Sequence, residues 1–141
     1  MFVPQIFPNN SYTAGSAIIN YLIKLLGKDK PEIDYFLLTH FHSDHYGSIQ
    51  EISGTSDNGY RLTGLTEVGD VIPIRSYVDR DYPNYNFPVD LLSNTKSTGV
   101  ELPAFTNLLK FLNYQKVHNS MKVEKFEVGS DKQFVLKKEP K

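Results

Sequence analysis

The chain has 141 residues, the length of about one ordinary domain. Hydrophobic residues make up 40% and charged residues 22% of it, which excludes a disordered or collagen-like chain. It has no cysteine, so disulfides and thiolate metal sites are excluded and any metal ligand must supply nitrogen or oxygen. No apolar run approaches the roughly 18 residues that span a bilayer, and residues 1–10 lack the basic start of a signal peptide. We expect one soluble domain without a membrane segment, and the native compartment stays open.

Charge is unevenly distributed along the chain, although the net charge is only −1. Residues 32–101 carry 11 acidic and 4 basic side chains, whereas residues 110–141 carry 8 lysines and 4 acidic side chains. A basic tail is one electrostatic signature of a nucleic-acid-binding protein. Lysines that alternate with apolar residues are more often the solvated faces of strands and helices, and we favour that interpretation.

The first half of the chain predicts a helix followed by a strand. Apolar residues at helical spacing predict a helix over residues 14–26, with Thr13 as its N-cap and Gly27 just past its end. A nearly continuous apolar run over 33–38 predicts a strand that ends at Thr39 and is buried on both faces. This order favours an α/β fold, in which ligands gather where the carboxyl end of a strand meets the next loop.

The remaining elements are less regular. Helical spacing from residue 102 to 117, with Pro103 in the first turn, predicts a second long helix. Pro, Asn, Tyr and Asp are frequent over 79–99, which indicates a long surface loop. Its tyrosines either stack on a sugar or base or, as we favour, cover the core. We also expect a short helix over 46–52, a loop over 53–60, one or two strands over 62–78 with Gly69-Asp70 as a turn, and strands over 121–128 and 133–136 joined at Gly129-Ser130-Asp131.

The loop after the first predicted strand concentrates the chemistry. Three of the four histidines and one carboxylate fall within six residues, as His40, His42, Asp44 and His45. Random shuffles of this composition produce that pattern roughly twice in ten thousand times. Imidazole nitrogens and carboxylate oxygens are zinc ligands, and His40 and His42 point to one side of an extended chain. If a helix starts at Asp44, then Asp44 and His45 point away from that pair and can address a second ion.

The segment Leu37 to Gly47 resembles the signature of the metallo-β-lactamase superfamily, and the match is complete through His45. The resemblance implies an αββα sandwich with a one- or two-metal hydrolytic site. It implies that His40 and His42 belong to a first zinc site and that Asp44 and His45 belong to a second, with Asp44 also orienting the attacking water. Tyr46-Gly47-Ser48 replaces the usual x-Gly-Gly. Among the branches, the competence-type, DNA-uptake-associated one is most similar.

Other parts of the family pattern are missing from this sequence. Only 39 residues precede His40, whereas family members usually place several strands there. The one later histidine, His118, lies in a polar context that does not resemble the later ligand motifs, and we interpret it as an exposed structural residue. We therefore expect residues 1–141 to form a single, incomplete domain: the central portion of the sandwich, cut at both ends.

We expect a zinc-dependent hydrolase whose isolated chain is weak or inactive, because two protein ligands per site are fewer than the three of a typical catalytic zinc. The alternative that this loop keeps the four residues but binds no metal has nearly equal support from the sequence. One alternative is a non-catalytic interaction or scaffold module derived from the fold, and a second is a nucleic-acid phosphodiesterase. The substrate that such a hydrolase implies is a small molecule or a phosphodiester. The uncovered sheet predicts a homo-oligomer or a partner that supplies the missing segment.

Overall fold

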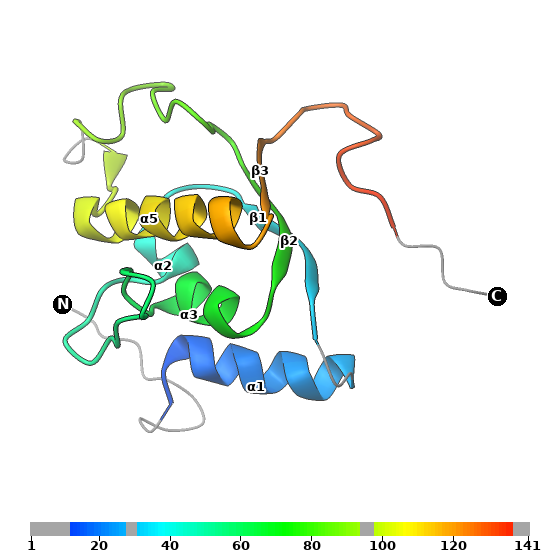
Figure 1. Cartoon of the computed structure of the whole chain (residues 1–141). Coiled ribbons are helices and arrows are strands. Elements are labelled where there is room, and N and C mark those ends of the chain that lie inside the picture. The colour runs from blue at the N-terminus through cyan, green and yellow to red at the C-terminus, as the bar shows by residue number, and fades with distance from the viewer. Residues whose placement is uncertain (1–11, 28–30, 94–97, 137–141) are drawn as a thin grey trace.

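The computed structural model describes residues 12–27, 31–93 and 98–136, and it shows an α/β fold (Figure 1). Three parallel strands form a sheet in the order β1-β2-β3. In Figure 1 the helices lie on one side of this sheet, and the segment that follows β3 lies on the other. The elements are α1 (Ala14–Leu26), β1 (Ile33–Leu38), α2 (Ser43–Tyr46), α3 (Gly64–Val71), β2 (Ile74–Asp79), α5 (Leu102–His118) and β3 (Lys122–Lys125).

Helix α1 has the predicted boundaries, and local chemistry explains both ends. The Thr13 hydroxyl oxygen accepts a hydrogen bond from the backbone N–H of Ser16 at 3.1 Å, which satisfies one of the free donors of the first turn. Gly27 adopts a left-handed φ of 55°, and its N–H donates to the carbonyl of Ile23. The predicted second long helix is also confirmed as α5, which begins at Leu102 with Pro103 in its first turn and ends at His118.

Strand β1 is confirmed, but the prediction that it is buried on both faces is wrong. β1 is the outer strand of the described sheet, and five of its six residues are partly or largely exposed. Only Leu38 is buried, at the carboxyl end. The apolar run therefore marks a strand of an α/β sheet without placing it at the centre.

Residues 62–78 contain a helix and one strand, so the prediction of strands around a Gly69-Asp70 turn is wrong. Leu65, Val68 and Ile72 are buried at helical spacing, and α3 forms because that face packs inward. The backbone N–H of Thr63 donates to the hydroxyl of Thr66 at 2.8 Å, which fixes the start of the helix. Gly69 lies inside α3, where an added Cβ would come within 2.4 Å of the Phe111 ring of α5.

Two further predictions fail. Residues 46–52 do not form a helix, because the short helix α2 comes earlier and ends at Tyr46. No hairpin forms over 121–136: β3 covers only Lys122–Lys125, pairs in parallel with β2, and is followed by irregular chain. That irregular segment still contacts the sheet, since Tyr35 and Phe134 have ring centroids 5.2 Å apart and the Val135 N–H donates to the Tyr35 hydroxyl.

The main core lies between the sheet and α5. Its buried residues include Leu38, Phe41, Tyr77, Phe105 and Phe111. A smaller cluster joins α1 to α3 through Ile19, Val68 and Ile72. The register aligns Leu38 with Asp79 and Asp79 with Lys125, so the three strands end at one edge. The loops that leave this edge form the candidate site. Within the described residues, no helix combines the length and apolar character needed to cross a bilayer.

Candidate functional site

The histidine loop, residues 39–45, leaves the carboxyl end of β1, and the ring of Phe41 anchors it to the core. Phe41 is buried and packs edge-on against Tyr85 and Phe105, with ring centroids 5.5 and 5.3 Å away. Because neighbouring side chains alternate in an extended segment, burying Phe41 turns His40 and His42 toward the surface. Of these two side chains, His42 is exposed and His40 is half-buried.

Helix α2 continues this pattern of buried and exposed positions. Ser43 and Tyr46 are buried, whereas Asp44 and His45 are exposed. Gly47 follows the last residue of the helix, and its φ of 112° and close packing against α3 exclude a side chain. An added Cβ there would lie 2.5 Å from the backbone nitrogen of Gly64. The packing of α2 on α3 therefore fixes how Asp44 and His45 are presented.

The three imidazoles of the loop lie together. The His40 and His42 rings have centroids 4.9 Å apart, and the His40 and His45 rings have centroids 3.9 Å apart. The Asp44 carboxylate lies 3.8 Å from Nε2 of His45. The expectation that His45 points away from the first histidine pair is therefore wrong: the short helix folds His45 back against His40.

The electrostatics of the loop favour neutral imidazole at His40. Its pKa is lowered from the ordinary value by desolvation first and then by the neighbouring His45 and His42, while Asp44 acts in the opposite direction. The Arg80 guanidinium adds to the lowering and lies over the Phe41 ring at 5.4 Å. A neutral imidazole keeps a nitrogen lone pair, which is the form that binds a metal.

The loop fits a divalent metal ion in chemistry and only in part in geometry. Imidazole and carboxylate are suitable ligands. Over residues 12–27, 31–93 and 98–136, however, no three His, Asp or Glu groups are arranged so as to hold one ion. His118 does not complete the set, because it is exposed at the end of α5 and stacks on Tyr114 with a 4.5 Å centroid distance. The described residues therefore form part of a metal site at most.

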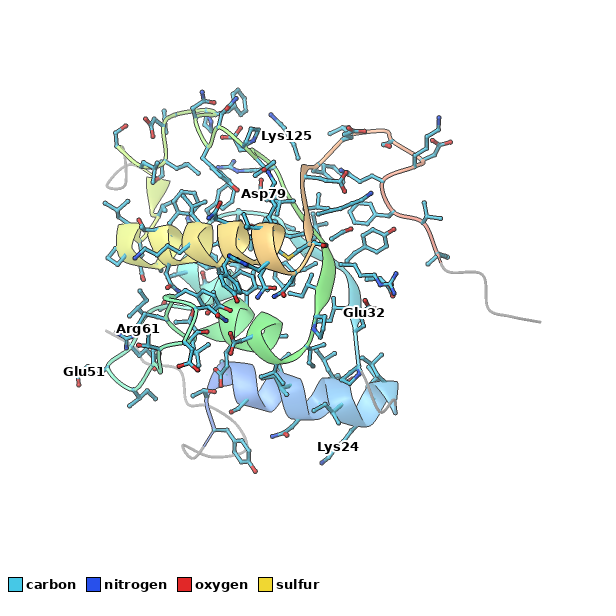
Figure 2. The ribbon with its side chains drawn as sticks, in the orientation of Figure 1. Lys24, Glu32, Glu51, Arg61, Asp79 and Lys125 are labelled. Carbon is cyan, nitrogen blue, oxygen red and sulfur yellow. The ribbon has the colours of Figure 1, made fainter. Side chains whose placement is uncertain are left out.

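Sequence reasoning missed Asp79, which ends β2 beside the histidine loop. Its carboxylate is fully buried and accepts hydrogen bonds from the backbone N–H groups of Asp81 and Tyr82 and from the Tyr85 hydroxyl, at 2.7–3.0 Å. Burial raises the pKa of Asp79, and these hydrogen bonds oppose the rise. Figure 2 shows Asp79 on the same side of the molecule as Lys125. The apolar pair Tyr77-Val78, followed directly by an aspartate, was the available signal.

The loop over residues 79–88 covers the core, as favoured from the sequence. Tyr85 is buried and contacts the rings of both Phe41 and Phe105. Asp81 is also buried, accepts from the Phe87 N–H at 2.8 Å and pairs with Lys125 at 3.7 Å. These contacts hold the loop against the sheet edge under the histidine loop.

A second missed feature reaches His42 from far along the sequence. The Nε2 atom of His42 lies 3.2 Å from the backbone carbonyl oxygen of Thr98. An added Cβ on Gly99 would come within 2.9 Å of that same nitrogen. No sequence signal could have found a backbone carbonyl as the partner of a histidine.

An apolar cavity of about 300 Å³ opens beside α2. Side chains from α1, β1 and α3 line it, among them Ile18, Phe36 and Leu65. Asp44 and His45 also line this cavity. The arrangement places an apolar cavity next to exposed polar groups of the histidine loop.

Comparison with known proteins bears on the segment that contains this loop. Residues 12–68 match the family model of the metallo-beta-lactamase superfamily. The matched segment, which includes α1, β1 and α2, covers less than half of the chain, and the α/β fold with its parallel sheet is consistent with a partial metallo-β-lactamase fold.

One curated relative is similar to part of this chain. A UPF0173 metal-dependent hydrolase of Staphylococcus carnosus (strain TM300) is 36% identical over 58 residues, which cover 41% of this chain and 24% of the relative. The matched segment thus spans about a quarter of that relative's length. No solved structure matches the chain.

Proposed function

We propose that the chain contributes the histidine-rich part of a metal-dependent hydrolase site, with zinc as the metal. The observation that carries the proposal is the gathering of the His40, His42 and His45 rings, together with Asp44, at the carboxyl edge of a parallel sheet. The match of residues 12–68 to the superfamily and the name of the staphylococcal relative support it.

The residues have separate roles in this proposal. His40, His42, Asp44 and His45 are the candidate ligands, and Asp44 also holds the attacking water by accepting one of its hydrogen bonds. A bound divalent ion supplies Lewis acidity at the scissile ester, amide or phosphodiester group. The apolar cavity beside His45 accommodates an apolar part of the substrate. The remaining ligands come from residues outside the described part of the chain or from a second chain.

A titration of the metal-free chain with Zn²⁺, in competition with a chromophoric chelator, tests the proposal. We expect weak binding that falls about 10-fold or more in His40→Ala and in His42→Ala, since each removes one ligand of an incomplete set. His118→Ala is the matched control and should leave the affinity unchanged. Equal affinity in all four proteins would contradict the proposal and favour a scaffold module derived from the fold.

Assays of hydrolysis address the second half of the proposal. Turnover of a lactam, a thioester and a phosphodiester by the isolated chain should be low or absent, because the ligand set is incomplete. Tight stoichiometric zinc together with turnover that His42→Ala abolishes would show that the site is complete and that the proposal of missing ligands is wrong.

A nucleic-acid phosphodiesterase, including the competence-type assignment, has less support. It predicts that lysines of residues 110–141 face the histidine loop. Two of them are already engaged near the 79–88 loop: Lys125 pairs with Asp81, and Lys116 donates to the Tyr82 hydroxyl at 2.8 Å.

A further inference from the structure

The backbone at Thr98 and Gly99 contacts a candidate ligand from a distant part of the sequence. Nε2 of His42 lies 3.2 Å from the Thr98 carbonyl oxygen, across 56 residues of sequence. A carbonyl oxygen only accepts hydrogen bonds, so Nε2 of His42 must donate. In a neutral imidazole only one nitrogen carries a proton, which leaves Nδ1 as the atom with the free lone pair.

Gly99 makes this contact sterically feasible. Its φ of +69° lies in the left-handed region, and an added Cβ would lie 2.9 Å from Nε2 of His42. A side chain at this position would therefore meet the imidazole itself.

The position of the carbonyl is fixed by the core. Val100 is buried in the main core cluster, and its N–H donates to the Thr98 hydroxyl at 3.4 Å. Helix α5 begins two residues later, and Ala104 and Phe105 in its first turn are also buried. The carbonyl is thus attached to the packed start of a 17-residue helix.

We propose that residues 98–99 are the positioning element of His42: the Thr98 carbonyl holds the imidazole in the Nε2–H tautomer, and Gly99 leaves room for the ring. His42 then offers Nδ1 to any ion. In metal sites, the hydrogen bond on one ring nitrogen selects the nitrogen that ligates, and loss of such a partner typically weakens metal affinity 10- to 100-fold. The role in metal binding rests on the proposed function, whereas the tautomer does not.

The test uses the ¹⁵N-labelled full chain without metal, with chelator, at about pH 8, where histidines with ordinary pKa values are neutral. Long-range ¹H–¹⁵N correlation spectra identify the protonated nitrogen of each imidazole, and His42→Gln assigns the His42 signals. We expect the Nε2–H tautomer for His42 in the wild type. The Nδ1–H tautomer, or an even mixture of both, would overturn the proposal.

Variants separate the ring contact from backbone strain. Gly99→Ala should change the His42 tautomer balance and weaken Zn²⁺ binding about 10- to 100-fold. Gly59→Ala is the control, because Gly59 also has a positive φ, of +86°, but an added Cβ there meets nothing within 4 Å. Thr98→Ala removes the hydroxyl that accepts from the Val100 N–H but keeps the carbonyl. Because Val100 is itself held in the core, this variant should keep the tautomer.

Thermal unfolding followed by circular dichroism shows whether each variant folds. If Gly99→Ala does not fold, the wild-type spectrum and Thr98→Ala still decide the proposal. If Gly99→Ala folds and leaves the His42 signals like those of Gly59→Ala, the proposal is wrong. If the His42 tautomer is as expected but neither the wild type nor any variant binds Zn²⁺, the positioning role stands and the proposed hydrolase function fails.

Discussion

Leu38 of β1 lies directly opposite Asp79 of β2 in the parallel register. The two strands therefore end at the same level, and the histidine loop and the 79–88 loop leave the sheet side by side. Phe41 and Tyr85 join the two loops through their ring contact. Tyr85 also donates to the buried Asp79 carboxylate, so this carboxylate helps to hold the residues that anchor the histidine loop.

Asp79→Asn should alter how stability depends on pH. Burial raises the pKa of Asp79 in the folded chain above its ordinary value of 3.8, which the unfolded chain keeps. At a pH between the unfolded-state pKa and the raised folded-state pKa, the folded chain therefore binds more protons than the unfolded chain. Its contribution to stability therefore falls as pH rises from about 4 through the raised pKa. Asparagine has the same shape and does not titrate. The free energy of unfolding of wild type minus that of Asp79→Asn, from urea denaturation at several pH values, should decrease over this window, and a constant or rising difference would contradict the prediction.

Tyr85→Phe should destabilise the fold, because the Tyr85 hydroxyl donates to the buried Asp79 carboxylate at 3.0 Å. A hydrogen bond to a charged group contributes about 1.5–3 kcal/mol. Tyr46→Phe is the matched control, since its buried hydroxyl has no hydrogen-bond partner among the described residues. Urea denaturation at pH 7 should show the loss in Tyr85→Phe alone, and equal losses in both variants would argue against a specific role for the Asp79 contact.

The sequence predicted those elements whose signals are local. Thr13 and Gly27 cap one amphipathic stretch, and Pro103 lies in the first turn of another. The boundaries of α1 and α5 could therefore be predicted to within about one residue. Residues 62–78 carry apolar residues that fit either helix or strand, and packing of the Leu65 face settled the outcome. Strand β3 has only four residues, and its pairing with β2 depends on a partner more than 40 residues away.

The candidate site divides in the same way. His40, His42, Asp44 and His45 are visible because one short loop carries all four. The close approach of His45 to His40 depends on the exact start of α2, which periodicity does not fix. The contact of Thr98 with His42 involves a backbone carbonyl, and every residue has one. Tertiary structure alone shows that contact.

Gly47→Ala should disrupt the packing of α2 against the start of α3. The added Cβ would lie 2.5 Å from the Gly64 backbone nitrogen, and the φ of +112° is itself unfavourable for alanine. Strain and overpacking together predict a loss above about 2 kcal/mol. Gly129→Ala, with a φ of +81° and nothing within 4 Å of the added Cβ, isolates the backbone term and should cost less. Denaturation midpoints that shift equally in both variants would show that the contact with Gly64 is not limiting.

The sheet face that carries Tyr35 and Leu37 should support self-association. β1 is the outer strand of the described sheet, Leu37 is 44% exposed, and Phe134 beside Tyr35 is 39% exposed. Unpaired strand edges and apolar patches are sites where further chains add, so we propose a homo-oligomer formed through this face. Light scattering at micromolar concentration should give more than the 16.1 kDa of one chain, and Leu37→Lys should shift the mass toward that value. Val71→Lys is the control, because Val71 is 56% exposed on α3, among the helices on the other side of the sheet. A monomer in the wild type would contradict this prediction, as would loss of association in the control variant alone.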